Sequence, residues 1–214
     1  MCIRDRARDT RHRILVASLL LFNEHGVPRT TINDIADEID ISPGNLHYHF
    51  RRKSDIVDAL TAEFQADARK VMHPPESETV SLDDFWWFLH HLLELKGAYR
   101  FMLTDSEVLA DEYPKVARVL RHFARGLDAM FEIYVIGLAR NGLLNVDMAA
   151  VRQVARNLAV IALMSERFDA LSGLRQDADD AAIGVARSLF SLLQPFATAE
   201  AARALEELAT HYAE

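Results

Sequence analysis

Glycine and proline are scarce in this chain, which holds 8 glycines and 6 prolines among its 214 residues. Their joint share is about half of the roughly 12% that is usual in proteins. β-Sandwiches, barrels and propellers need a turn about every 8–12 residues, and this sequence does not supply enough turn formers for them. Apolar residues instead recur with the period of an α-helix along every strongly patterned segment. We therefore predict an all-α protein.

Composition excludes several other classes of protein. The apolar stretch at residues 14–22, broken only by Ser18, spans nine residues, about half of the roughly 18 that a membrane span needs. The single cysteine excludes a disulfide scaffold and a multi-cysteine metal site. The first 13 residues are mostly charged and do not resemble a secretory signal. We expect a soluble, cytoplasmic protein without a membrane segment.

The net negative charge of the chain comes entirely from the later part of the sequence. Residues 1–70 hold 11 Lys or Arg and 11 Asp or Glu, whereas residues 71–214 hold 13 and 21, which accounts for the whole net charge of −8. The basic residues of the first part cluster at positions 4–13 and 51–53. This asymmetry is either an accident of composition or a sign that the two parts have different tasks.

Helix-capping signals and apolar periodicity together predict ten helices. Thr31 with Asp34 makes a pair like a capping box, and Ser42 before Pro43 is a typical helix start. Residues 73–78 have the composition of a linker. The expected helices cover about residues 9–25, 31–39, 43–50, 54–72, 81–96, 99–110, 114–140, 147–172, 177–194 and 198–211.

Two of these helices, Thr31–Ile39 and Pro43–Phe50, have the lengths and the short connection of a helix-turn-helix. Their apolar positions would pack the pair at a fixed angle. Tyr48 is either a half-buried packing residue or a residue that contacts DNA. The positions left at or near the exposed side of the second helix are Asn45, His47, Tyr48 and His49.

The segment ISPGNLHYHF at residues 41–50, followed by Arg51-Arg52-Lys53, resembles the DNA-recognition segment of the TetR (tetracycline-repressor-like) family of bacterial regulators. Gly26, the pair Thr30-Thr31, Ile35-Ala36 and Ile39 resemble the same family over its first two helices. The resemblance covers about residues 10–60. It implies an N-terminal helix-turn-helix domain joined by a long helix to a larger helical domain for ligand binding and dimerisation. We expect a leader at 1–8 and domains at 9–54 and 55–214.

The resemblance also implies roles in DNA binding. Thr31 and Lys53 would each contact a phosphate, and the second helix of the motif would face the DNA backbone or base edges. Two positions depart from the family's pattern, because Asp40 stands where glycine is usual and His47 where tyrosine is usual. Asp tolerates a left-handed backbone at modest cost, so we expect the turn to survive. The expected DNA-binding residues are Thr31, Pro43, Gly44, Asn45, His47, Tyr48, His49 and Lys53.

Aromatic and methionine side chains are frequent in the larger C-terminal part. Four consecutive aromatic residues at 85–88 cannot all face one core, because neighbouring helix positions point about 100° apart. Such residues are most simply a helical core, whereas the family resemblance implies a ligand cavity suited to an apolar or amphipathic molecule. The candidate lining is Trp86, Trp87, His90, Phe101, Phe123, Met130, Tyr134, Met164 and Phe168.

Evidence for metal or cofactor chemistry is weak. His90 and Glu94 lie one helical turn apart, but no further ligand spacing supports a site. Phosphate-binding loops, dinucleotide glycine patterns and nucleophile–base sets are also missing from the sequence. We therefore expect no metal, no cofactor and no enzymatic activity.

The two long helices near the C-terminus carry stripes of small residues suited to close packing. The resemblance implies that they form a four-helix dimer interface, although a contact within one chain explains mid-helix Gly184 equally well. The candidate interface is Leu158, Ile161, Ser165, Ala181, Gly184, Val185 and Ser188.

Taken together, these features predict a homodimeric, ligand-responsive transcriptional repressor. Its partners would be a palindromic double-stranded operator, a second copy of itself and a small apolar or amphipathic effector. The alternatives are an all-helical enzyme and a protein-interaction bundle without operator binding.

Overall fold

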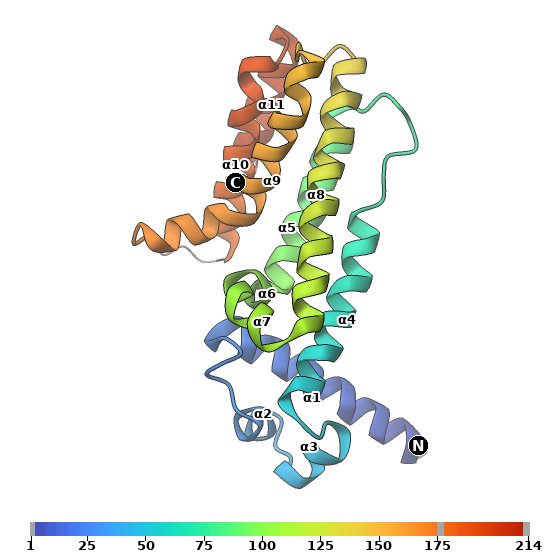
Figure 1. The fold of residues 1–214 in the computed structure, drawn as a ribbon, viewed down its shortest axis with the longest axis vertical. Coiled ribbons are helices and arrows are strands. Elements are labelled where there is room, and N and C mark those ends of the chain that lie inside the picture. The colour runs from blue at the N-terminus through green and yellow to red at the C-terminus, as the bar shows by residue number, and fades with distance from the viewer. Residues whose placement is uncertain (1–2, 175–177, 212–214) are drawn as a thin grey trace. The chain divides into compact units, whose positions relative to one another are not determined.

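The computed structural model describes residues 3–174 and 178–211, and all of its regular elements there are helices (Figure 1). The all-α prediction is confirmed. In the described ranges no helix is long and apolar enough to cross a membrane. The α-helices are α1 (Ile3–His25), α2 (Ile32–Glu38), α3 (Pro43–His49), α4 (Lys53–Val71), α5 (Leu82–Ala98), α6 (Arg100–Thr104), α7 (Ser106–Glu112), α8 (Pro114–Arg140), α9 (Met148–Leu171), α10 (Ala178–Leu193) and α11 (Ala199–His211), with a short 3₁₀ helix η1 (Gln194–Phe196) before the last.

The capping signals near the start of the chain act as predicted. The Thr31 hydroxyl accepts a hydrogen bond from the Asp34 backbone N–H, and the Asp34 carboxylate accepts one from the Thr31 N–H at 2.7 Å. This reciprocal capping box opens α2. At α3 the Ser42 hydroxyl accepts from the Asn45 N–H, and Pro43 occupies the first turn.

Three helix boundaries differ from the prediction. α1 begins at Ile3, so residues 3–8 continue the helix where a leader was expected. α4 begins at Lys53 and not after Ser54, because the Asp55 carboxylate accepts a hydrogen bond from the Arg52 N–H. The single helix expected over residues 99–110 is divided into α6 and α7 at Asp105.

The chain forms two compact units, which cut across the boundary predicted at residue 54. The first combines residues 1–67 with 98–121. In its core Phe22 of α1 packs against Phe101 of α6, with their ring centroids 5.5 Å apart. The Asp105 carboxylate accepts a hydrogen bond from the Val27 N–H, and the Asn23 side-chain oxygen accepts one from the Phe101 N–H. These bonds fix α6 on the end of α1.

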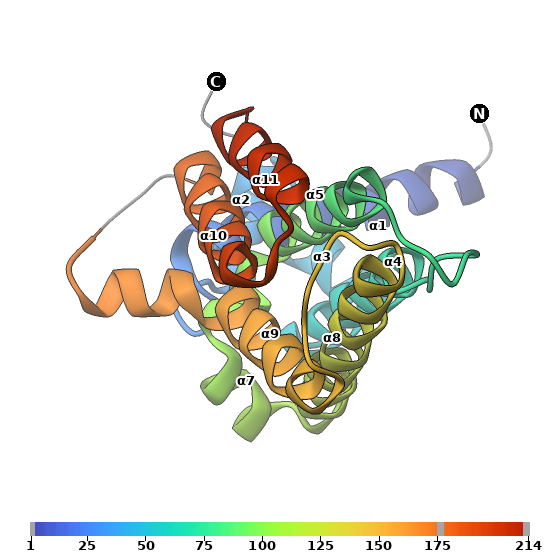
Figure 2. The same cartoon turned by 90° about the horizontal axis from the view of Figure 1, so that it is seen from above.

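The second unit combines residues 68–97 with 122–214. Its core contains an aromatic cluster in which Phe85 of α5 contacts Phe131 and Tyr134 of α8 and Phe190 of α10. α9, α10 and α11 lie side by side in this unit (Figure 2).

Candidate DNA interface and small-molecule pocket

The turn between α2 and α3 is held by the left-handed backbone of one residue. Asp40 has a φ of 52°, which confirms that aspartate replaces the expected glycine without loss of the turn. The next N–H, of Ile41, donates to the Ala36 carbonyl at 3.0 Å. Ile35, Ala36 and Leu46 are fully buried, so the two helices are packed as one rigid pair.

The residues predicted to touch DNA from α3 lie mostly on an exposed surface. Pro43, Gly44, Asn45 and His47 are exposed, and Tyr48 is 80% exposed with its ring edge against His49. The packing interpretation of Tyr48 is therefore wrong, because a residue so open contributes little to a core. One face of α3 thus presents amide, imidazole and phenol groups to the surroundings.

The two histidines of α3 differ in their surroundings. His49 is half-buried, and this burial, together with the nearby positive charge of Arg11, lowers its pKa below the ordinary 6.5. Its imidazole is therefore neutral at pH 7 and offers one hydrogen-bond donor and one acceptor. The exposed His47 places Nδ1 3.3 Å from the Arg51 carbonyl oxygen.

Lys53 is placed differently from the simple phosphate contact that the resemblance implies. Its Nζ donates to the Val27 carbonyl at 2.8 Å and to the Thr30 carbonyl at 3.0 Å. The ammonium therefore braces the segment between α1 and α2 from the start of α4. Two of its three N–H donors are used in this way, so at most one remains for a phosphate.

Two basic residues of α1 also stabilise the helix-turn-helix, although their sequence pattern does not indicate it. The Arg13 guanidinium donates to the Ile39 carbonyl at 2.9 Å, which closes the end of α2. Arg11 lies over the Phe50 ring, 4.8 Å from its centroid, in a cation–π contact. Both partners are distant in sequence, so no local signal could have identified them.

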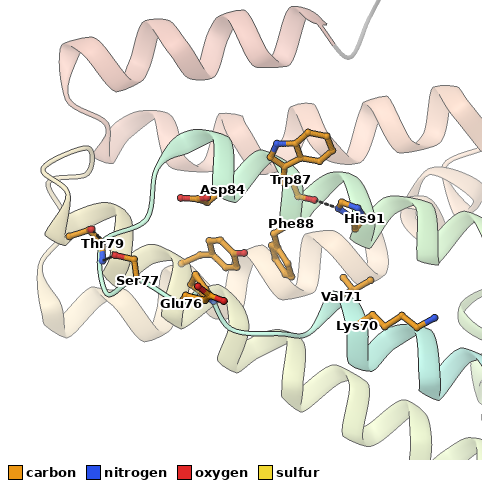
Figure 3. Close-up of a pocket in the computed structure, with 11 residues that line it drawn as sticks. Lys70, Val71, Glu76, Ser77, Thr79, Asp84, Trp87, Phe88 and His91 are labelled. Carbon is orange, nitrogen blue, oxygen red and sulfur yellow. Dashed lines mark hydrogen bonds between the residues drawn. The ribbon is translucent and has the colours of Figure 1, made fainter.

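A pocket of about 630 Å³ lies in the second unit, between the end of α4, the 72–81 linker, α5 and α8 (Figure 3). The linker is anchored to α8 because Gly137 has no side chain, and a Cβ there would collide with Val80. The Val80 N–H donates to the Gly137 carbonyl, and the Asn141 amide donates to the Val80 carbonyl. The lining is Lys70, Val71, Pro75, Glu76, Ser77, Thr79, Asp84, Trp87, Phe88, His91 and Tyr134.

Only two of the residues predicted for a ligand cavity, Trp87 and Tyr134, line this pocket. Phe101 packs on Phe22 in the other unit. Phe123 and Met130 are buried, and Trp86 stacks on His90 with the rings 5.2 Å apart. Met164 and Phe168 are 45% and 68% exposed on α9 and do not belong to the lining of this pocket.

The polar residues of the pocket were missed because the linker brings them together. Glu76 belongs to the segment predicted as a linker, and Asp84 accepts hydrogen bonds at the start of α5. His91 lies on α5 beside His90, the residue that the sequence pairs with Glu94. Among the described residues, no group of three or more metal-binding side chains forms, and His90 pairs with Glu94 at 3.4 Å.

The candidate dimer residues divide into buried and accessible positions. Leu158 and Val185 are fully buried where α9 packs on α10, so their side chains belong to the core of the single chain and cannot face a second copy. The others are half-buried or exposed: Ile161, Ser165, Ala181, Gly184 and Ser188. These remain available for an interface.

Comparison with known protein families identifies the family to which this chain belongs. A family model described as "Bacterial regulatory proteins, tetR family" matches residues 14–60, and one described as "Bacterial transcriptional repressor" matches residues 63–205. The chain belongs to the TetR family. Members of this family are transcription regulators, which removes the alternative of an all-helical enzyme.

Individual relatives agree with this membership. A solved TetR-family transcriptional regulator from Marinobacter aquaeolei VT8 is 28% identical, with a TM-score of 0.83 over 95% of this chain and 98% of that one. The probable HTH-type transcriptional regulator ArpR of Pseudomonas putida is 27% identical over 61% of this chain and 58% of its own length. The HTH-type transcriptional regulator TtgR, also of Pseudomonas putida, is 32% identical over 35% of this chain and 36% of its own length. The matched region thus spans between about a third and three fifths of these two curated relatives.

Proposed function

We propose that this TetR-family protein is a ligand-responsive transcriptional repressor of the cytoplasm that binds a palindromic operator as a homodimer. The observation that carries the proposal is the exposed polar face of α3, set on a rigidly braced helix-turn-helix. A helix so presented fits the major groove, and a dimer would place two of them about 34–36 Å apart, or a multiple of that spacing.

Within this interface the side chains have separable roles. The Asn45 amide can pair with two atoms of an adenine edge, so we assign it to base reading. Thr31, Tyr48 and the neutral His49 would position the motif on phosphates and sugars, which carry no sequence information of their own. Lys53 contributes mainly by holding the α1–α2 segment.

One continuous helix provides the route from effector to operator. α4 begins at Lys53, which braces the helix-turn-helix, and ends at Val71, which lines the pocket. An effector that fits the pocket best with α4 displaced would favour a dimer in which the two α3 helices no longer match the groove spacing. Such a ligand would release the operator.

The test is binding to the DNA that flanks the gene, followed by fluorescence anisotropy across salt concentrations. We expect sequence-selective binding whose affinity falls steeply between about 50 and 200 mM salt, because phosphate contacts release counterions. Asn45→Ala should relax preference at one base pair per half-site by about 1–3 kcal/mol. The exposed Asn157 on α9 supplies a matched control, and Asn157→Ala should bind as the wild type does.

A protein that binds no flanking DNA selectively would contradict the proposal and favour an interaction bundle. An Asn45→Ala variant that loses affinity equally for all sequences would make Asn45 a backbone contact.

A further inference from the structure

Two aromatic side chains line one side of the pocket. Phe88 of α5 and Tyr134 of α8 are stacked, with ring centroids 4.6 Å apart and planes inclined by 19°. In Figure 3 Phe88 leaves α5 on the side of the linker, whereas Trp87 points to the opposite side. A volume of about 630 Å³ is in the range of drug-sized ligand sites, about 300–1,000 Å³. The stacked pair therefore gives the pocket an apolar aromatic side against which a ring system can pack.

The Tyr134 hydroxyl is a polar group available to a ligand. The side chain is 6% exposed and lines the pocket, and none of the described residues forms a hydrogen bond with its hydroxyl. Burial and then the negative charge of Asp84 raise its pKa to about 12, so the phenol stays protonated at neutral pH. The hydroxyl therefore has no partner within the described part of the protein and can donate a hydrogen bond to a ligand in the pocket.

The remaining polar groups of the pocket are mostly acceptors. Asp84 uses Oδ2 to accept from the Ser81 N–H and hydroxyl, which leaves Oδ1 for other contacts. His91 Nδ1 lies 2.7 Å from the Trp87 carbonyl, and since a carbonyl only accepts, Nδ1 is the donor and Nε2 is the ring nitrogen left for a ligand. Glu76 adds a second carboxylate from the linker.

Lys70 is the only lysine or arginine in the lining, and in Figure 3 its side chain extends away from Glu76 and Phe88. The pocket thus combines an aromatic wall with two carboxylates and an imidazole acceptor. A cation beside these groups gains from both carboxylates.

We propose that the effector is an aromatic compound bearing a protonated amine, with its ring packed against the side formed by Phe88 and Tyr134 and its ammonium beside Asp84 and Glu76. This inference rests on the proposed function for the meaning of "effector", but the charge preference of the pocket is tested without DNA. Neutral and anionic aromatic compounds of the same shape should bind more weakly, because they leave the two carboxylates without a counter-charge.

The experiment compares naphthylmethylamine, naphthylmethanol and naphthoate by isothermal titration calorimetry on the full chain. The three probes share one ring system and differ in charge. We expect the amine to bind about fivefold more tightly than the alcohol, and naphthoate to bind most weakly. Tyr134→Phe should weaken the amine and the alcohol alike, since it removes only the hydroxyl.

Variants of the carboxylates assign the preference to this pocket. Asp84→Asn keeps an oxygen that can cap α5, and Glu76→Gln changes an exposed linker residue. Each single variant should reduce the preference for the amine over the alcohol by about twofold, and the double variant should abolish it. The neighbouring exposed residue Asp83 does not line the pocket, so Asp83→Asn should leave the preference unchanged.

Equal binding of amine and alcohol, tighter binding of naphthoate, or no binding of any probe at millimolar concentration would overturn the inference. An amine preference that survives in the Asp84→Asn, Glu76→Gln double variant would also overturn it. None of these results bears on operator binding, whereas failure to bind DNA would refute the proposed function and leave the charge preference intact.

Discussion

The ion pair between Lys96 of α5 and Glu166 of α9 gives the sharpest prediction about stability. The two atoms Nζ and Oε1 are 2.8 Å apart, and the lysine side chain is 3% exposed while that of the glutamate is 32% exposed. Removing one partner of a buried pair costs about 3–5 kcal/mol when the other is left as an uncompensated buried charge. Because water reaches the glutamate side, we expect Glu166→Ala to cost about 2–3 kcal/mol in the free energy of unfolding.

The opposite substitution should be much milder. Lys96→Met replaces a buried ammonium with an apolar side chain of similar length, and the Glu166 carboxylate can turn to water. We expect a cost under about 1 kcal/mol, and the double variant should be no worse, because neither charge then remains buried. Glu78→Ala breaks the exposed pair with Arg140 and serves as the control, with no measurable change expected.

The assay is urea unfolding followed by circular dichroism. The protein concentration is held fixed, because the stability of the proposed dimer would depend on it. A cost of 2–3 kcal/mol corresponds to a fall of about 4–12 °C in Tm for a chain of this size. If Lys96→Met were as destabilising as Glu166→Ala, or if the double variant lost the sum of the two, the reasoning about the stranded charge would be refuted.

Three further predictions concern the DNA-binding unit and assembly. Lys53→Met should lower the free energy of unfolding by about 1–3 kcal/mol because it leaves two carbonyls without a donor, whereas Arg51→Met should not. If Lys53→Met also lowers the salt slope of DNA binding by about one unit, Lys53 neutralises a phosphate as well. Gly184→Arg should dissociate the proposed dimer on light scattering, whereas Gly97→Arg, at a site with open space, should not. A dimeric Gly184→Arg variant would place that glycine outside the interface. The Thr31 backbone hydrogen bond lowers the pKa of Asp34 below 3.8. The contribution of Asp34 to the free energy of unfolding is therefore complete above about pH 4 and is lost as pH falls through the lowered pKa. Asp34→Asn should flatten the acid side of the stability–pH curve, and an unchanged curve would contradict this.

Features of this fold that depend on neighbouring residues could be read from the sequence. The capping box of Thr31 and Asp34 and the Ser42 cap before Pro43 each lie within one helical turn, so the start of α2 and of α3 followed directly. The tolerance of the turn for Asp40 followed from the intrinsic preference of aspartate. Exposure of the α3 face followed from the helical period.

Features that depend on distant contacts could not be read in this way. The resemblance implied that Lys53 contacts a phosphate, but its ammonium donates to two carbonyls of the α1–α2 segment. One of them belongs to Val27, which is 26 residues away in the sequence, so no local pattern indicates the contact. Small and apolar stripes do not show which side of a helix another helix will cover, and Leu158 and Val185 were assigned to the wrong side. The polar pocket forms only when the linker with Glu76 folds against α5 and α8.

The central claim is that one pocket and one operator site are coupled, and linkage tests it most directly. The affinity of the DNA-releasing effector should be measured by equilibrium titration with and without saturating operator, and the operator's affinity with and without saturating effector. The two factors must be equal, and we expect both to lie in the range of about 5–150. An effector affinity that is the same with and without bound operator would contradict the account.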